Sequence, residues 1–234
     1  VEAGRPDSIT EGKLRSMKTH GVTRISINPQ SMKEHTLELL GRKHTVEEIR
    51  EKFMLARTLG FDNINMDLIA GLPEETLEDF KETLREVEAL KPDSITVHTL
   101  VIKRASRLRK EQLEQGGEMR EEDACIEPMQ KEAEQFCRVH GYEPYYMYRQ
   151  KNKAHTTRNT NQENVAYAKP GKECLYNIFI MEELQSILAL GSGGSSKIVF
   201  PEENRMERVE NVKSVDDYIG RIDEMIRRKK ESWR

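Results

Sequence analysis

The residues of this sequence that could do chemistry lie within or just after short apolar runs. Asp67 lies within the run from Ile64 to Pro73, which reads Ile-Asn-Met-Asp-Leu-Ile-Ala-Gly-Leu-Pro. Asn28 and Gln30 follow the preceding run of this kind, and His98 lies near the end of the next one. Carboxylates, amides and imidazoles exchange hydrogen bonds with polar ligands. These positions are therefore the first candidates for a binding site.

Asp67 is the candidate with the clearest structural setting. A short run of Ile, Met and Leu predicts a strand that is buried on both faces, as in a parallel sheet. Gly71 and Pro73 then turn the chain, and Thr76 with Asp79 forms the capping-box pattern that begins a helix. A carboxylate in such a strand is costly unless it is paired. Asp67 is thus either a ligand contact at the carboxyl end of the strand or a buried group that caps a neighbouring loop.

The elements that would position these residues follow a repeated pattern. Three strands are expected, each after a Gly or Pro turn: 23–27, 64–69 and 94–100. Helices with apolar faces are expected between them, and two of these are 46–59 and 77–90. This order predicts consecutive right-handed βαβ units. If Glu2 ends a further strand, the polar strand ends converge on one face of a barrel or open sheet; the alternative is a generic α/β protein with exposed polar ends.

The pattern changes after residue 100, where a smaller α+β region is expected. A helix is predicted at 121–140, an aromatic edge strand at 141–148, a polar, Asn-rich loop at 149–171 and a closing amphipathic helix at 214–230. In the closing helix the residues predicted to face inward are Val215, Tyr218, Ile219, Ile222 and Ile226. The Gly/Ser-rich stretch 191–197 has Ser196 where a phosphate-binding loop needs Gly before its Lys, so a tight turn is favoured.

The composition of the chain excludes several classes of protein. The 234 residues are 36% hydrophobic and 34% charged, and Lys+Arg 38 against Asp+Glu 41 gives a net charge of −3. This balance predicts neither a nucleic-acid-binding nor a membrane surface. The cysteines, at 125, 137 and 174, are odd in number, which argues against a disulfide framework. They show no CxxC spacing, which argues against a metal site and favours buried structural cysteines. With no apolar run of membrane-spanning length and no signal peptide, a cytoplasmic location is expected.

Taken together, the motifs resemble one family. The segments that carry the resemblance are Glu-Ala-Gly-Arg-Pro-Asp at 2–7, Arg-Ile-Ser-Ile-Asn-Pro-Gln-Ser at 24–31, Arg42, Asn-Met-Asp-Leu-Ile-Ala-Gly-Leu-Pro at 65–73, Glu-Asn-Val-Ala-Tyr-Ala-Lys-Pro-Gly-Lys-Glu at 163–173 and Leu-Ala-Leu-Gly-Ser-Gly-Gly-Ser-Ser at 188–196. They resemble the radical SAM enzymes of the oxygen-independent coproporphyrinogen III oxidase (dehydrogenase) group, in the branch found in Gram-positive bacteria. The resemblance covers nearly the whole chain.

The resemblance implies an α/β fold, a portion of a partial (β/α)6 barrel over residues 1–105, followed by a family-specific C-terminal region over residues 106–234. It implies that S-adenosylmethionine binds across the carboxyl ends of the strands. Glu2 matches the acid that contacts the methionine or ribose part, and Gln30 and Asp67 match the side chains that hold the ribose hydroxyls. Arg42 matches the arginine that reaches the methionine carboxylate, although an exposed charge at a helix end is an alternative reading of this residue.

The resemblance also implies a reaction in haem biosynthesis. S-adenosylmethionine is cleaved reductively at a [4Fe–4S] cluster, and two propionates of coproporphyrinogen III lose carbon dioxide to give protoporphyrinogen IX. The implied partners are a tetrapyrrole substrate and an electron donor, with neither nucleic acid nor membrane. Two other readings remain open: a haem-binding or haem-trafficking relative on the same barrel, and an unrelated α/β binding module.

One motif of the family is missing from this sequence. The family holds its cluster with a Cys-xxx-Cys-xx-Cys loop after the first strand, and a Gly-rich motif follows the second strand; neither occurs here. Cys125, Cys137 and Cys174 do not replace that loop by spacing or position. No metal ligand and no catalytic residue is therefore assigned. The simplest interpretation is that residue 1 falls in the third strand of a longer protein, and that this fragment is inactive by itself.

Overall fold

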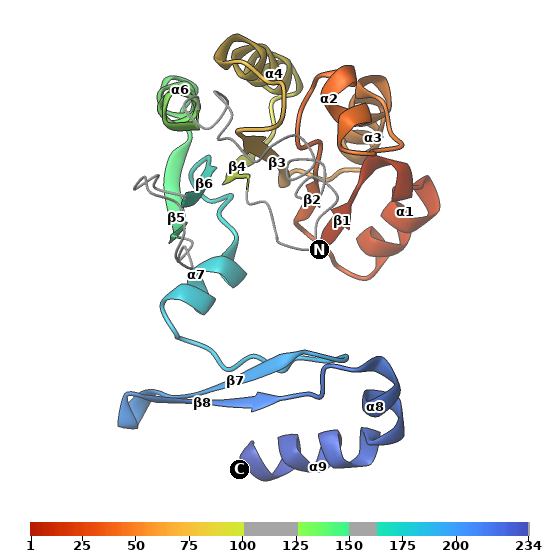
Figure 1. Cartoon of the computed structure of the whole chain (residues 1–234), viewed down its shortest axis with the longest axis vertical. Coiled ribbons are helices and arrows are strands. Elements are labelled where there is room, and N and C mark those ends of the chain that lie inside the picture. The colour runs from red at the N-terminus through yellow and green to blue at the C-terminus, as the bar shows by residue number, and fades with distance from the viewer. Residues whose placement is uncertain (101–125, 150–162, 234) are drawn as a thin grey trace, which may run out of the picture. The chain divides into compact units, whose positions relative to one another are not determined.

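Two compact units, Val1–Glu173 and Cys174–Arg234, make up the chain. The computed structural model describes residues 1–100, 126–149 and 163–233 (Figure 1). The boundary predicted between residues 105 and 106 lies outside these described residues. Across the described ranges, no helix combines the length and the apolar character that crossing a membrane requires.

The first unit is built on a six-stranded sheet with the order β1-β2-β3-β4-β6-β5. Its first four strands are parallel and pair in sequence order: β1 (Glu2–Gly4), β2 (Ile25–Ile27), β3 (Ile64–Ala70) and β4 (Ser94–Thr99). The three strands predicted from the sequence are therefore confirmed, as is the further strand at Glu2. The α/β fold class with a parallel sheet is confirmed as well.

Helices connect the parallel strands and lie along the outer side of the sheet (Figure 1). They are α1 (Glu11–Thr19), α2 (Glu34–Leu39), α3 (Val46–Thr58) and α4 (Leu77–Leu90), and the short 3-10 helix η1 (Pro6–Ser8) follows β1. The capping boxes read from the sequence are present at the starts of α3, with Thr45 and Glu48, and α4, with Thr76 and Asp79. Each box satisfies backbone N–H groups that the first turn leaves free, so these two helices begin where their sequences predict.

The core lies between these helices and one face of the sheet. Alternate residues of the central strands are fully buried there, namely Ile25, Ile27, Ile64, Met66 and Leu68, together with Phe53 of α3 and Phe80 of α4. Because successive side chains of a strand point to opposite faces, the residues between them face the other way. Those residues are polar: Ser26 in β2, and Asn65 and Asp67 in β3. The run around Asp67 is a strand as predicted, but it has one apolar face and one largely polar face.

Helix α6 (Ile126–Val139) packs against β3, β4 and α4, and it meets the loop after β3 at Gly71. Gly71 has φ +82°, and its backbone N–H donates to Met129 Sδ at 3.3 Å. A methyl group on its Cα would lie 2.6 Å from Ile126 Cγ1. Only glycine therefore combines this backbone conformation with this close approach.

Replacing Gly71 with Ala is expected to lower the free energy of unfolding by about 2 kcal/mol, from left-handed strain plus the collision with Ile126. Gly141→Ala is the matched control, because Gly141 also has a positive φ, +76°, but nothing lies within 4 Å of the added methyl. The control should cost about 1 kcal/mol, from strain alone. Urea denaturation followed by circular dichroism measures both. Equal losses in the two variants would show that the contact with α6 does not constrain Gly71.

Two antiparallel strands extend the sheet beyond β4. They are β6 (Glu163–Ala168), which pairs with β4, and β5 (Glu143–Arg149), which pairs with β6. β5 confirms the predicted aromatic edge strand. The prediction of a loop over 149–171 was wrong for its last part, because residues 163–168 form a strand between two others. Residues 150–162 of that stretch lie outside the described residues.

The second unit contains a two-stranded antiparallel sheet and three helices. Its elements are α7 (Leu175–Met181), β7 (Ser195–Phe200), the 3-10 helix η3 (Pro201–Glu203), β8 (Arg205–Glu210), α8 (Val215–Gly220) and α9 (Ile222–Ser232). The Gly/Ser stretch turns at 191–193 as predicted, and β7 begins at Ser195. The closing helix is two helices rather than one. Four of its five predicted inward residues, Val215, Ile219, Ile222 and Ile226, are exposed, whereas Met225 is buried.

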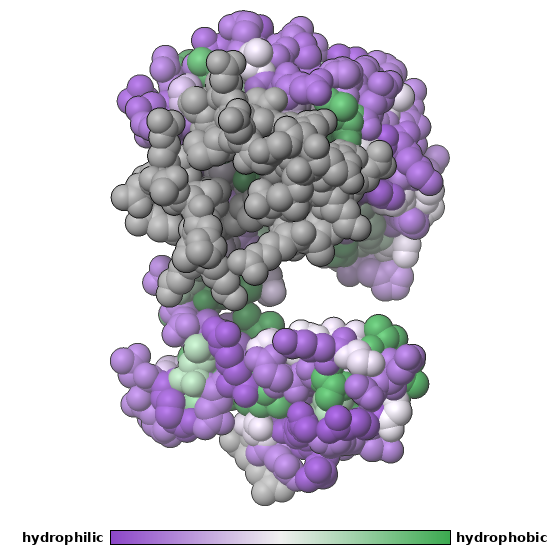
Figure 2. Space-filling view, in the orientation of Figure 1, coloured by the Kyte–Doolittle hydropathy of each residue, from purple (hydrophilic) through white to green (hydrophobic). Residues whose placement is uncertain are grey.

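The surface differs between the two units. Figure 2 shows mainly hydrophilic residues over the described helices of the first unit, in keeping with the charge-rich sequence. In the second unit, eleven large apolar side chains are exposed: Leu175, Tyr176, Met181, Leu184, Leu188, Leu190, Val215, Ile219, Ile222, Ile226 and Trp233. The second unit, considered by itself, therefore leaves much of its apolar surface uncovered.

Candidate functional site

The polar face of the sheet carries a continuous chain of hydrogen bonds from β1 to β3. Asn28 Nδ2 donates to Glu2 Oε2 at 3.0 Å, and Ser26 Oγ donates to Asn28 Oδ1 at 2.6 Å. Asn65 Nδ2 then donates to Ser26 Oγ at 3.0 Å and to Asp67 Oδ1 at 2.6 Å. Glu2 and Asp67, which the sequence analysis selected separately, are thus the two ends of one network.

Asn65 is the centre of this network. Its side-chain oxygen accepts from Ser94 Oγ at 3.0 Å and from Thr96 Oγ1 at 3.1 Å, both in β4. Together with the two bonds that its amide nitrogen donates, this uses both donors and both acceptors of the amide. Asn65 is only 3% exposed. It therefore ties β2, β3 and β4 together on their polar face and fixes the orientation of Asp67.

Asp67 also lies beside the histidine at the end of β4. Its Oδ2 is 3.7 Å from His98 Nε2, and the two side chains are 16% and 35% exposed. One carboxylate oxygen is thus held by Asn65, while the other lies near an imidazole, and the side chain as a whole is partly exposed. A partly buried carboxylate held on one side can accept hydrogen bonds from a hydroxyl-bearing ligand on the other.

Gln30 is joined to Asp67 through the backbone. Its N–H donates to the Asp67 carbonyl at 3.0 Å, and its own carbonyl accepts from Ile69 N–H at 2.9 Å, which forms an isolated parallel bridge to β3. Gln30 has φ 71°, in the left-handed region that a residue with a Cβ seldom adopts. Such a conformation persists only where the surroundings hold it, and it is most common at functional sites.

Arg42 follows α2 and is half-buried. Among the described residues, no carboxylate lies within ion-pair distance of its guanidinium. Burial and the nearby Arg5 lower the pKa of Arg42, against the raising effect of Asp7. Asp7 itself pairs with Arg5 at 3.0 Å. A half-buried guanidinium beside a second one is a site that favours an added anion.

His44 lies close to Arg42 and is fully buried. Its Nδ1 is 3.7 Å from Asp7 Oδ1, and neither ring nitrogen has a hydrogen-bond partner among the described residues. Burial lowers the pKa of His44, against the raising effect of Asp7. Burial thus disfavours the charged imidazolium form of His44 beside Arg42.

The four predicted site residues are thus brought together to different degrees. Glu2 and Asp67 share the hydrogen-bond network, and Gln30 is bridged to Asp67 by its backbone. Within the described part of the chain, no hydrogen bond links Arg42 to these three, and it lies beside the residues that follow β1. The arrangement offers carboxylate and amide acceptors for ligand hydroxyls and a separate guanidinium for a ligand carboxylate.

The sequence analysis missed the polar residues inside the strands. Ser26, Asn65, Ser94 and Thr96 are buried and connect the positions that were selected at the strand ends. The signal that could have identified them is alternation. Each of the three strands has a polar residue at every second position of its central part, between residues that are mostly Ile, Met, Leu or Val.

The described cysteines do not fit an iron–sulfur cluster. Cys137 lies inside the core, where burial raises the pKa of its thiol to about 12, and Cys174 lies in the second unit. Cluster ligands are thiolates supplied by several cysteines close together. Cys137 is buried as expected, Cys174 is only half-buried, and Cys125 lies outside the described residues. The described residues could therefore hold the organic cofactor but do not supply a cluster.

The family comparison agrees with the resemblance of the motifs. Residues 3–87 match the radical SAM superfamily. This match includes Gln30, Arg42, Asp67 and the whole polar network except for Glu2 and the residues of β4. A radical SAM domain implies S-adenosylmethionine and a [4Fe–4S] cluster as cofactors.

Among curated proteins, two groups of relatives are similar to the chain. It is 46% identical over 223 residues to the oxygen-independent coproporphyrinogen-III oxidase-like protein HemZ of Bacillus subtilis, a match that covers 95% of the chain and 43% of HemZ. It is 27% identical over 197 residues to the heme chaperone HemW of Escherichia coli, covering 84% of the chain and 46% of HemW. The chain thus spans less than half the length of either relative.

One solved structure shares the fold. Coproporphyrinogen III oxidase (HemN) from Escherichia coli, a radical SAM enzyme, superposes with a TM-score of 0.65 at 20% identity. The superposition covers 94% of this chain and 48% of HemN. At this identity the likeness shows the fold alone, and it confirms the predicted portion of a radical SAM barrel.

Proposed function

Because the chain carries a radical SAM domain and is related to coproporphyrinogen-III oxidase-like proteins, we propose that the carboxyl ends of β1 to β3 bind S-adenosylmethionine. Asp67 and Gln30 accept hydrogen bonds from the ribose hydroxyls. Glu2 contacts the methionine or ribose part, and Arg42 binds the methionine carboxylate. The network through Asn65 and Ser26 holds the two carboxylates apart and oriented before the ligand arrives.

The observation that supports this proposal most strongly is the environment of the Arg42 guanidinium. The guanidinium is half-buried, has a like-charged neighbour in Arg5 and meets no carboxylate within the described ranges of the chain. A free carboxylate that binds there gains a charge-assisted, bidentate pair and relieves the repulsion between the two arginines. The carboxylate of an amino-acid ligand fits this requirement.

Replacing Arg42 with Ala is expected to raise the Kd for S-adenosylmethionine about 20-fold, the effect of one lost charge-assisted pair, while Arg42→Lys should lose less. Isothermal titration calorimetry on the full-length protein measures the change. Arg50→Ala is the matched control, because Arg50 pairs on the surface with Glu47 at 2.9 Å and Glu86 at 2.7 Å. An unchanged Kd in Arg42→Ala would assign Arg42 to the exposed helix end instead.

For the full-length protein we propose the oxidative decarboxylation of coproporphyrinogen III propionates to the vinyl groups of protoporphyrinogen IX, in the cytoplasm and with an external electron donor. Bound S-adenosylmethionine would supply the radical chemistry that removes a hydrogen atom from each propionate side chain, and the electron released with carbon dioxide would pass to an electron acceptor. The residues of this chain bind and orient the cofactor, and the sheet and its helices keep water from it. The name of the Bacillus relative, at 46% identity, supports the tetrapyrrole substrate.

The second candidate function is that of a haem chaperone, which the similarity to HemW favours. Anaerobic incubation of the full-length protein with coproporphyrinogen III, S-adenosylmethionine and a reductant separates the two. Formation of protoporphyrinogen IX supports the dehydrogenase. Stoichiometric haem binding without any turnover of coproporphyrinogen would assign the chaperone function instead.

A further inference from the structure

The segment that presents Gln30 is held in place from α4 as well as from β3. Both backbone groups of Gln30, its N–H and its carbonyl, are hydrogen-bonded to β3. The next residue, Ser31, is only 1% exposed. Ser31 Oγ donates a short hydrogen bond to Glu75 Oε1 and accepts one from Lys33 N–H at 3.2 Å. A left-handed backbone such as that of Gln30 persists only where surrounding contacts hold it.

Glu75 is an unusual residue to find at this position. It lies between β3 and α4, immediately before Thr76, which caps α4, and only 3% of it is exposed. Its Oε1 accepts from Ser31, and its Oε2 has no hydrogen-bond partner in the described part of the structure. A buried carboxyl group carries a free-energy cost. An apolar side chain at this position would fill the same space with a lower desolvation cost.

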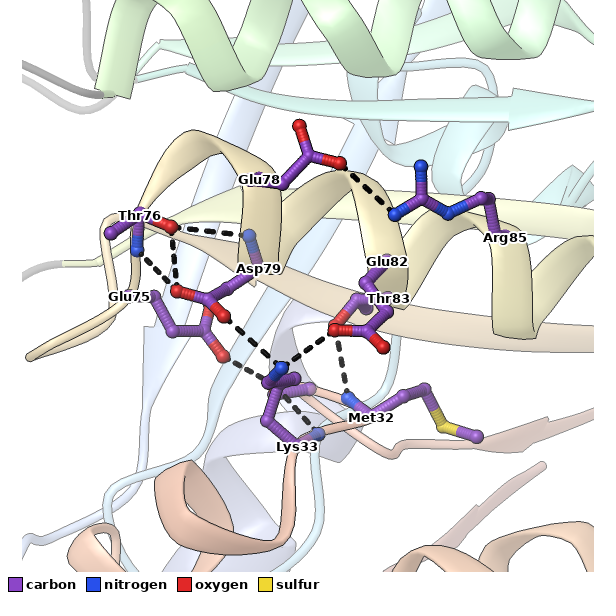
Figure 3. Close-up of polar contacts among 10 residues, drawn as sticks. Met32, Lys33, Glu75, Thr76, Glu78, Asp79, Glu82, Thr83 and Arg85 are labelled. Carbon is purple, nitrogen blue, oxygen red and sulfur yellow. Dashed lines mark hydrogen bonds and ion pairs between the residues drawn. The ribbon is translucent and has the colours of Figure 1, made fainter.

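The nearby cation does not neutralise Glu75. Lys33 Nζ instead pairs with Asp79 at 3.1 Å and Glu82 at 2.6 Å, both on α4 (Figure 3). Burial raises the pKa of Glu75, and Asp79 adds to this, while the hydroxyls of Ser31 and Thr36 act in the opposite direction. Burial thus disfavours the charged form of the carboxyl group that meets Ser31, and glutamine is a neutral side chain that keeps an acceptor oxygen.

Further hydrogen bonds and ion pairs hold the 30–33 segment in place. Met32 N–H donates to Thr83 Oγ1 at 3.2 Å, so the residue after Ser31 is also bonded to α4. The 30–33 segment is therefore tied to β3 through the backbone and to α4 through side chains. Of the side-chain contacts of this segment, the bond from Ser31 to Glu75 is the one adjacent to Gln30.

We propose that Glu75 is a positioning residue for cofactor binding: through Ser31 it keeps Gln30 in the left-handed conformation in which the Gln30 side chain meets the ribose. The inference rests on the proposed function. Glu75 does not touch the cofactor, and its whole effect on affinity passes through Gln30.

The test is a double-mutant cycle on the Kd for S-adenosylmethionine, measured by calorimetry on the full-length protein. Glu75→Ala and Ser31→Ala should each raise the Kd about tenfold, and Glu75→Gln should stay within about threefold because its amide oxygen still accepts from Ser31. In the Gln30→Ala background, Glu75→Ala should add almost nothing. Glu78→Gln, which changes only exposed pairs with Arg85 at 3.1 Å and Lys81 at 3.9 Å, is the matched control and should bind normally.

The outcomes separate this inference from the proposed function. If wild type does not bind S-adenosylmethionine, the proposed function fails and the inference with it. If wild type binds but Ser31→Ala binds equally well, only the inference fails. If Glu75→Ala weakens binding by the same factor in wild type and in the Gln30→Ala background, Glu75 has a general structural role and the inference also fails. Should Glu75→Ala not fold, Ser31→Ala in both backgrounds decides the question.

Discussion

Full-length protein carrying Asp67→Ala is expected to bind S-adenosylmethionine about 100-fold more weakly than wild type. Asp67 has one oxygen fixed by Asn65 at 2.6 Å, which leaves the rest of the carboxylate positioned for ligand hydroxyls. A loss of this size corresponds to two charge-assisted hydrogen bonds to the ribose that contribute about 1.4 kcal/mol each. Asp67→Asn keeps the shape but not the charge, and about a tenfold loss is expected for it.

The matched control for Asp67 is Asp62, which precedes the same strand. Asp62 is exposed, with 81% of its side chain accessible, and it pairs with Lys172 at 3.3 Å. Asp62→Asn should leave the Kd unchanged. Calorimetric titration compares the three variants, and their melting temperatures show whether they are folded. If Asp67→Ala is folded and binds S-adenosylmethionine as wild type does, Asp67 acts only as an internal partner of Asn65, the structural alternative that its sequence left open.

The sequence predicted those parts of the fold that depend on local signals. The starts of α3 and α4 follow from their capping boxes, and the apolar spacing after Val46 and Leu77 fixes the faces that they bury. The parallel order of β1 to β4 follows from the alternation of strands and helices. In these segments the local preference and the tertiary structure agree, so sequence reasoning is sufficient.

The strand at 163–168 could not be predicted in the same way. Its buried residues include Ala166 and Ala168, which have low intrinsic strand preference, and the polar residues before it indicated a loop. It is a strand because β4 and β5 pair with it on both sides. Both partners are separate elements along the chain, so the information lies in the tertiary structure rather than in the segment.

The closing segment shows the opposite failure. A single helix over 214–230 was predicted from apolar spacing, yet the chain breaks at Arg221 between α8 and α9. Met225 is the buried residue of α9, while Ile222 and Ile226 are exposed. Apolar spacing identifies a helix and its apolar stripe, but it does not show which part of a wide stripe is covered in a small unit.

The sequence indicated the candidate site residues but not the residues that position them. Glu2, Gln30 and Asp67 were selected from their positions at predicted strand ends, whereas Arg42 and the expected ligand came from the resemblance, and the chemistry of these four side chains suits that ligand. The residues that position them were missed, because a polar residue at alternate strand positions is usually read as facing solvent. Here Ser26, Asn65, Ser94 and Thr96 face one another on the inner side of the sheet, and each is at least nine-tenths buried.

The Asn65 amide is therefore expected to be among the largest polar contributors to stability in the first unit. Asn65→Leu keeps a similar volume but removes four hydrogen bonds, at 3.0, 2.6, 3.0 and 3.1 Å. At about 1 kcal/mol for each bond, the free energy of unfolding should fall by about 4 kcal/mol. Part of this loss arises because the Thr96 hydroxyl stays buried after its acceptor has gone.

Asn63 provides the matched control for Asn65, since it is the same residue type two positions earlier. Its side-chain oxygen is buried and has no hydrogen-bond partner among the described residues. Asn63→Ala should therefore change the free energy of unfolding by less than about 0.5 kcal/mol. Urea denaturation followed by circular dichroism measures both variants. A loss below about 1 kcal/mol in Asn65→Leu would mean that water replaces the amide on the polar face, and that the network orients Asp67 without stabilising the sheet.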